Sequence, residues 1–123
     1  MKNHIKSQAY SGMIYLIQQC ATQEQIEEML EILGSYIKLA VDIERRILTG
    51  GGELHADCEA LLLENGSKQV DIWGADWYPL TQEVGYESLI NIRPRQNNRS
   101  MEIQDPVIRE RVAQIVQQLL GGL

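Results

Sequence analysis

Residues 36–75 read YIKLAVDIERRILTGGGELHADCEALLLENGSKQVDIWGA, and the spacing of apolar residues in this stretch decides the predicted fold. Three segments within it alternate apolar and polar residues with a period of two, which is typical of strands with one buried face. They cover residues 37–44, 54–62 and 69–73. The alternation therefore predicts three neighbouring strands that share one apolar face and one polar face.

Two turns join these predicted strands. Gly50-Gly51, or a loop two residues longer, makes the first hairpin, and residues 64–66 make the second as a three-residue loop that ends in glycine. We favour this register because it keeps one face of the sheet wholly apolar. It sets Glu59 beside Asp71 on the polar face, which also carries Trp73.

The polar face carries acidic side chains that repel one another unless a cation neutralises them. Four of its residues are candidate ligands for a divalent cation: His55, Asp57, Glu59 and Asp71. Carboxylates suit Mg²⁺ or Mn²⁺, an imidazole also suits Zn²⁺, and opposed carboxylates suit general acid/base chemistry. No established metal motif is present. The interpretation we favour is that arginines such as Arg46 and Arg93 neutralise the face through salt bridges.

A second polar cluster lies in residues 93–100, which read RPRQNNRS. The forked guanidinium group of arginine binds phosphate and carboxylate well. The candidate ligand-binding residues are Arg93, Arg95, Asn97, Asn98 and Arg99, together with Trp73. Trp73 and Trp77 could stack on a base or sugar, or cover a core edge or an oligomer interface. A polar connector whose arginines pair with the acids of the sheet is the simpler explanation.

One helix is predicted before the strands along the chain and one after them. Thr22 with Gln25 matches a capping box, and the apolar stripe that follows stops at Gly34. Asp105-Pro106 matches the start of a last helix that ends at Gly121. Residues 13–17 fit either a short strand or the end of a preceding helix.

The predicted fold class is α+β. Residues 84–92 supply a fourth strand, so we expect a mostly antiparallel four-stranded meander. Its apolar face packs against the two helices, and its polar face is open to water or covered by a partner. Residues 1–12 are expected to be a flexible extension, and residues 13–123 a single domain.

Composition narrows the function classes. A chain of 123 residues with 44% hydrophobic and 23% charged residues fits one globular domain. The net charge of −6 argues against non-specific nucleic-acid binding, which depends on neutralising phosphates. Two cysteines are too few for a disulfide framework, and Cys58 is predicted to be buried. With neither a membrane-length apolar run nor a convincing signal peptide, we expect a cytoplasmic protein.

Several longer strings resemble an uncharacterised single-domain family of bacteria and archaea, from about Met13 to the C-terminus. They are VDIE, GGELHADCE, NGS, DIWG, INIRP and NRSMEIQD, which begin at residues 41, 51, 65, 71, 90 and 98. The resemblance implies one compact domain. It implies no activity and no catalytic residue.

From the sequence we expect a small binding module that uses its polar sheet face and the arginine-rich loop. The partner would be an unidentified protein or a small anionic ligand, with a homo-oligomer as one candidate assembly. Two alternatives stay open: a hydrolase of phosphate esters or nucleic acid that uses a divalent cation, and a small RNA-binding protein. The sequence does not decide whether the protein is an enzyme.

Overall fold

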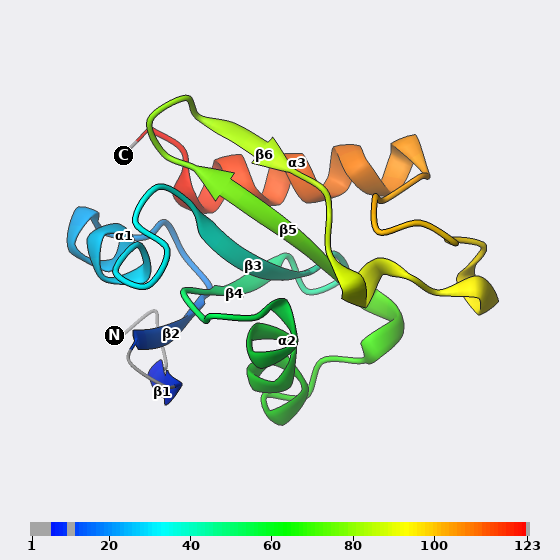
Figure 1. Cartoon of the computed structure of the whole chain (residues 1–123), viewed down its shortest axis with the longest axis horizontal. Coiled ribbons are helices and arrows are strands. Elements are labelled where there is room, and N and C mark those ends of the chain that lie inside the picture. Colours follow the sequence, from blue (N-terminus) through cyan, green and yellow to red (C-terminus); the bar gives the residue numbers. More distant parts are fainter. Residues whose placement is uncertain (1–5, 10–11, 123) are drawn as a thin grey trace.

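The computed structural model describes residues 6–9 and 12–122, and its strands form one six-stranded antiparallel sheet (Figure 1). The strands are β1 (Lys6–Ala9), β2 (Gly12–Ile17), β3 (Ile37–Asp42), β4 (Ile47–Gly50), β5 (Ile72–Tyr78) and β6 (Glu83–Gly85). From β2 onward their order is β2-β4-β3-β5-β6. The α+β class is confirmed, but a plain meander is wrong because β2 pairs with β4 and β3 lies between β4 and β5.

The sheet lies between helices on both faces. These are α1 (Gln23–Met29), α2 (His55–Glu64) and α3 (Pro106–Leu120), with the short 3-10 helices η1 (Gln69–Asp71), η2 (Leu89–Asn91) and η3 (Pro94–Gln96). Figure 1 shows α2 and α3 on opposite sides of the strands. The larger core lies under α1 and α3, and a smaller core lies under α2. Within the described residues, no helix is long and apolar enough to cross a membrane.

Helix α2 occupies the segment that was predicted to be the second strand, and that prediction is wrong. Residues 55–64 are rich in alanine, leucine and glutamate, which favour helix. Cys58, Leu61 and Leu62 recur at helical spacing and form the buried side. Gly66 has the predicted left-handed conformation, with φ +99°, but it follows the end of a helix rather than closing a hairpin.

Strand β3 pairs with β5 on one side and with β4 on the other, and the sequence analysis missed β4. The connecting turn lies before β4, where Arg46 has φ 59°, and not at Gly50-Gly51. Gly50 is itself in β4, and a Cβ there would come within 2.7 Å of a methyl group of Leu39. The glycine is therefore needed for close packing within the sheet.

The face of the sheet opposite α1 and α3 is covered by α2, so the predicted open polar face is wrong. Alternation along β3 is as predicted, with Ile37, Leu39 and Val41 in the larger core. Val41 pairs with Trp73 on β5, and directly paired residues share a face, so Trp73 points into that core as well. Its predicted place on the polar face is wrong.

The remaining predictions concern the termini and the helix ends. The capping box of Thr22 and Gln25 is confirmed, although the regular helix ends at Met29 rather than near Gly34. The start of α3 at Asp105-Pro106 and its end at Gly121 are also confirmed. Residues 13–17 form most of β2. Of the predicted extension, residues 1–5 and 10–11 lie outside the described residues, and Lys6–Ala9 form β1, which pairs with β2.

Of the predicted fourth strand, residues 84–92, only the first two belong to a strand. Strand β6 ends at Gly85, and the chain then continues through η2 and η3 to α3. This long connection passes the end of the sheet beside α2 and projects beyond it, as the yellow and orange segment of Figure 1 shows. The connection places the arginine-rich residues near η1 and α2.

Candidate functional site

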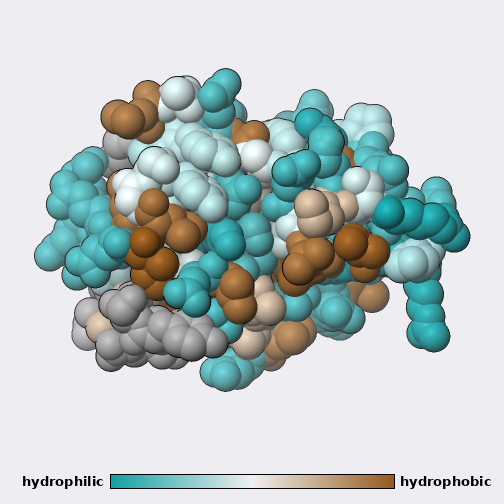
Figure 2. Space-filling model, in the orientation of Figure 1, coloured by the Kyte–Doolittle hydropathy of each residue, from teal (hydrophilic) through white to brown (hydrophobic). Residues whose placement is uncertain are grey.

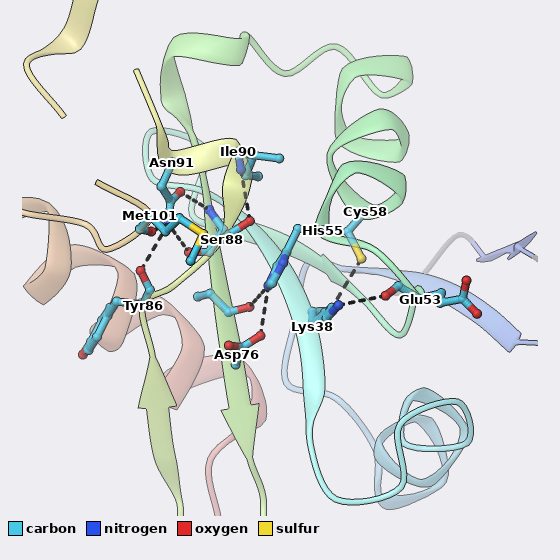
Figure 3. Close-up of polar contacts among 12 residues, drawn as sticks. Lys38, Glu53, His55, Cys58, Asp76, Tyr86, Ser88, Ile90, Asn91 and Met101 are labelled. Carbon is cyan, nitrogen blue, oxygen red and sulfur yellow. Dashed lines mark hydrogen bonds and ion pairs between the residues drawn. The ribbon is translucent and has the colours of Figure 1, made fainter. Parts of the chain in front are cut away.

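Asn91 fixes the connection to the sheet. Its side chain is fully buried, and its Oδ1 accepts a hydrogen bond of 2.8 Å from the backbone N–H of Gly74. Its Nδ2 donates to the carbonyl groups of Gly74, Tyr86 and Met101 (Figure 3). A buried amide with all its hydrogen-bonding groups satisfied specifies one conformation of the chain around it.

Asn98 closes the loop that follows in the same way. Its Nδ2 donates to the carbonyl groups of Asn91, Ser100 and Glu102, at 2.8 to 3.0 Å. Its Oδ1 accepts from the backbone N–H of Gln104. Asn98 was predicted to bind a ligand, but it is only 2% exposed, so its side chain is not accessible to one in this structure.

Arg93 is also buried, and its guanidinium group is held from several sides. It donates to the carbonyl groups of Ile90 and Gln69, both at 2.8 Å, and lies over the ring of Trp73, with the guanidinium carbon 4.7 Å from the centroid. One of its nitrogens lies 3.6 Å from Oε2 of Glu59 on α2. The predicted pairing of Arg93 with an acid is thus confirmed for Glu59.

Burial shifts both members of this pair toward their neutral forms. It raises the pKa of Glu59, against the attraction of Arg93 and a hydrogen bond from Gln69. It lowers the pKa of Arg93, against the attraction of Glu59. The ion pair therefore holds two charges that the surroundings alone would disfavour.

Three of the predicted ligand-binding residues are exposed: Arg95, Asn97 and Arg99. Arg99 donates to Oδ1 of Asn97 at 3.1 Å. Arg95 makes no hydrogen bond or ion pair within the described part of the chain. The structure therefore divides the predicted cluster into buried structural residues and an exposed set.

A groove of about 520 Å³ lies between η1 and η3, and we call it the arginine groove. It is lined by Gln69, Val70, Ile92, Arg93, Pro94, Arg95 and Gln96. Val70 is 57% exposed and Ile92 is 45% exposed, so the groove has an apolar floor open to solvent. The sequence analysis missed this because it placed both residues on apolar strand faces.

The four predicted metal ligands are not brought together. His55, Asp57 and Glu59 lie on α2, and Asp71 ends η1. Glu59 faces Arg93 rather than Asp71, because its segment is helical. No group of three or more His, Cys, Asp or Glu side chains in residues 6–9 and 12–122 could hold a metal ion.

The tryptophans and Cys58 belong to the cores. Trp73 is 1% exposed and Trp77 is fully buried, so neither can stack on a base at the surface. Burial raises the pKa of the Cys58 thiol to about 12, which keeps it protonated and unreactive near neutral pH. The predicted burial of Cys58 is confirmed.

His55, the first residue of α2, reaches the sheet beside β5 (Figure 3). Its Nε2 lies 2.9 Å from Oδ1 of Asp76 and 3.0 Å from the carbonyl oxygen of Ala75. Lys38 on β3 pairs with Asp76 on β5, and its Nζ donates to the carbonyl of Glu53 at 3.0 Å. These three side chains converge because α2 crosses the end of both strands.

A smaller cavity of about 210 Å³ adjoins His55, and we call it the histidine pocket. Its lining is Lys38, Leu54, His55, Ala56, Ser88, Leu89 and Ile90. Leu54 and Leu89 are 47% and 73% exposed and form part of its rim. Figure 2 shows hydrophobic surface over the region where Figure 1 draws η2 beside α2. Asp76 was missed because its contact with His55 exists only when residue 55 is helical.

Comparisons with known proteins assign no activity to these features. The family model described as "Protein of unknown function (DUF5674)" matches residues 15–119. No curated protein and no solved structure matches the chain.

Proposed function

The chain belongs to this family of unknown function, and on that premise we propose that the domain is a binding module for a small anionic molecule with an apolar body. The ligand would occupy the arginine groove. The observation that carries the proposal is a rigidly held segment that leaves apolar side chains and an unpaired cation exposed side by side.

Buried side chains beneath the arginine groove hold its backbone in place. Asn91 and Asn98 fix the backbone on either side of η3, and Arg93 ties η1 to η2 through the carbonyls of Gln69 and Ile90. A surface that is ordered before binding loses little conformational entropy when a ligand arrives.

Charge and shape suggest the class of ligand. Arg95 lies on the rim without an intramolecular acid, while Val70 and Ile92 form the floor. An anionic group would pair with Arg95, and an apolar body would cover the floor. The volume of about 520 Å³ falls within the usual range for small-molecule sites.

The fluorescent probe 1-anilinonaphthalene-8-sulfonate tests this proposal, because it joins a sulfonate to an aromatic body. We expect saturable binding by the wild-type protein and a dissociation constant that is several-fold larger in Arg95→Gln. Arg99→Gln is the matched control, since it removes the same charge from an exposed residue that does not line the groove. Val70→Ser should also weaken binding.

Two results would overturn the proposal. One is equal binding by the Arg95 and Arg99 variants, which would mean that the probe senses only net charge. The other is a dimer of the unliganded wild type that Arg95→Gln dissociates, measured by light scattering. In that case a second copy of the chain, and not a small anion, occupies the groove.

A further inference from the structure

The histidine pocket carries an inference that is independent of the arginine groove. Nε2 of His55 lies within hydrogen-bond distance of Oδ1 of Asp76 and of the carbonyl oxygen of Ala75. Both atoms are acceptors, so Nε2 must carry a hydrogen. The neutral imidazole then has its lone pair on Nδ1.

Nδ1 of His55 is available to a ligand. It has no hydrogen-bond partner among the described residues, and it is not one of the fully buried side-chain atoms that lack a partner. Asp76, by contrast, is 8% exposed and points toward the ring (Figure 3). A buried carboxylate that accepts from one imidazole nitrogen orients the ring and stabilises the cation formed when the other nitrogen takes a proton.

The rest of the pocket suits a small organic molecule. Its walls come mainly from Leu54, Leu89 and Ile90, and Lys38 supplies a cation on the same lining. Among the described residues, the ammonium group of Lys38 has one acceptor, the carbonyl of Glu53, and it therefore retains hydrogens for a ligand. An apolar wall excludes water and so strengthens the electrostatic interactions that a bound molecule makes with His55 and Lys38.

We propose that the histidine pocket is a general-base site for small, mostly apolar molecules that develop negative charge on oxygen when they lose a proton. In this step a C–H bond of the substrate breaks, and its proton moves to Nδ1 of His55. The electron pair of that bond passes through the substrate to an oxygen atom, where Lys38 stabilises the charge. His55 is the catalytic residue, and Asp76 is a positioning residue.

The ring opening of 5-nitrobenzisoxazole is a direct probe of such a site. A base removes the proton on C3, the electron pair of the C–H bond forms the nitrile, and the N–O bond breaks. The product, 2-cyano-4-nitrophenolate, absorbs visible light, and its oxygen takes the charge. No oxidant or other reactant is needed, so the rate reports the base and its surroundings.

We expect the wild-type protein to open the ring with saturation kinetics and His55→Gln to lower kcat/KM at least tenfold. Lys38→Met should lower kcat, because it removes the cation and keeps the stem. Leu89→Ser should raise KM, since Leu89 lines the pocket. Leu80→Ser is the matched control, because Leu80 is 96% exposed and lies away from the pocket, and it should change neither constant.

A rate no greater than that of buffer, or a His55→Gln variant as active as the wild type, would overturn the proposal. ¹⁵N NMR provides a second test, in which the measurement on the wild type needs no variant to fold. The neutral His55 ring should show a protonated Nε2, and Asp76→Asn should change the balance of the two tautomers. A proton on Nδ1 of the neutral wild-type ring would exclude that atom as the base.

Discussion

Helix α2 makes two charged contacts one turn apart, and they differ in what surrounds them. Glu59 meets Arg93, which is also held by the carbonyls of Ile90 and Gln69 and by the ring of Trp73. His55 meets Asp76 and the carbonyl of Ala75, and one of its two ring nitrogens stays without a partner in the described residues. Nη2 of Arg93 and Oε2 of Glu59, the facing atoms of the first contact, are buried and make no hydrogen bond within the described part of the chain, so a ligand has no access to them. The partnerless nitrogen of His55 belongs to a side chain that lines the histidine pocket.

The difference teaches that a polar pair is structural or functional according to whether a ligand can reach its unused hydrogen-bonding atoms. Both pairs join α2 to other parts of the chain: Glu59 to Arg93 in the connection between η2 and η3, and His55 to Asp76 on β5. The Glu59–Arg93 pair fixes the floor under the arginine groove, and the His55–Asp76 pair borders the histidine pocket. Mutations should therefore damage stability most at the first pair and local chemistry most at the second.

Arg93→Met should have the largest effect on stability. It leaves the half-buried Glu59 without its cation and removes the donors to two carbonyl groups. We expect the free energy of unfolding to fall by roughly 3–5 kcal/mol, measured by urea denaturation at neutral pH. Arg95→Met is the control from the same segment, and since Arg95 is exposed it should change stability by less than about 0.5 kcal/mol.

Combining Arg93→Met with Glu59→Gln should recover part of the loss, because the buried charge is then gone. If Arg93→Met were as mild as Arg95→Met, Glu59 would have another source of compensation. The claim that the Glu59–Arg93 pair is mainly important for stability would then be wrong.

His55→Gln should cost less. The glutamine amide keeps a donor near Asp76 and Ala75, and residue 55 is the first residue of the helix, so we expect a loss of about 0.5–1.5 kcal/mol. The same denaturation experiment measures it. A loss equal to that of Arg93→Met would show that the histidine contact is as structural as the arginine contact, and would weaken the case for the pocket.

The sequence predicted the elements whose signals are local. The capping box of Thr22, the start of α3 at Asp105-Pro106, and the alternation along β3 all depend on neighbouring residues and are confirmed. The buried state of Cys58 was also predicted, because that residue is internal in both the strand and the helix interpretation.

The error at residues 54–62 shows why the site could not be predicted in full. Alternation of period two and a helical stripe through Cys58, Leu61 and Leu62 coexist in the same residues, and a short apolar run cannot separate them. Tertiary packing favours helix there, because β4 and β5 occupy the two edges of β3 and leave no edge of that strand for residues 54–62. Once the segment was taken as a strand, Glu59 faced Asp71 and an acidic metal site followed, while the contact of His55 with Asp76 was hidden.

The smallest expected effect is the pH dependence that Glu59 contributes, and it separates burial from pairing. Burial raises the pKa of Glu59 despite Arg93, so the folded protein holds a proton there at pH values where the unfolded chain has released it. By linkage, the stability gained from Glu59 is present in full below its unfolded pKa and is lost as pH rises through the folded pKa. The free energy of unfolding of the wild type, minus that of Glu59→Gln, should therefore decline as pH rises from about 4 toward neutrality and then level off. A difference that rises with pH would mean that attraction to Arg93 outweighs burial, and that this pair gains stability from its charges rather than bearing a cost for them.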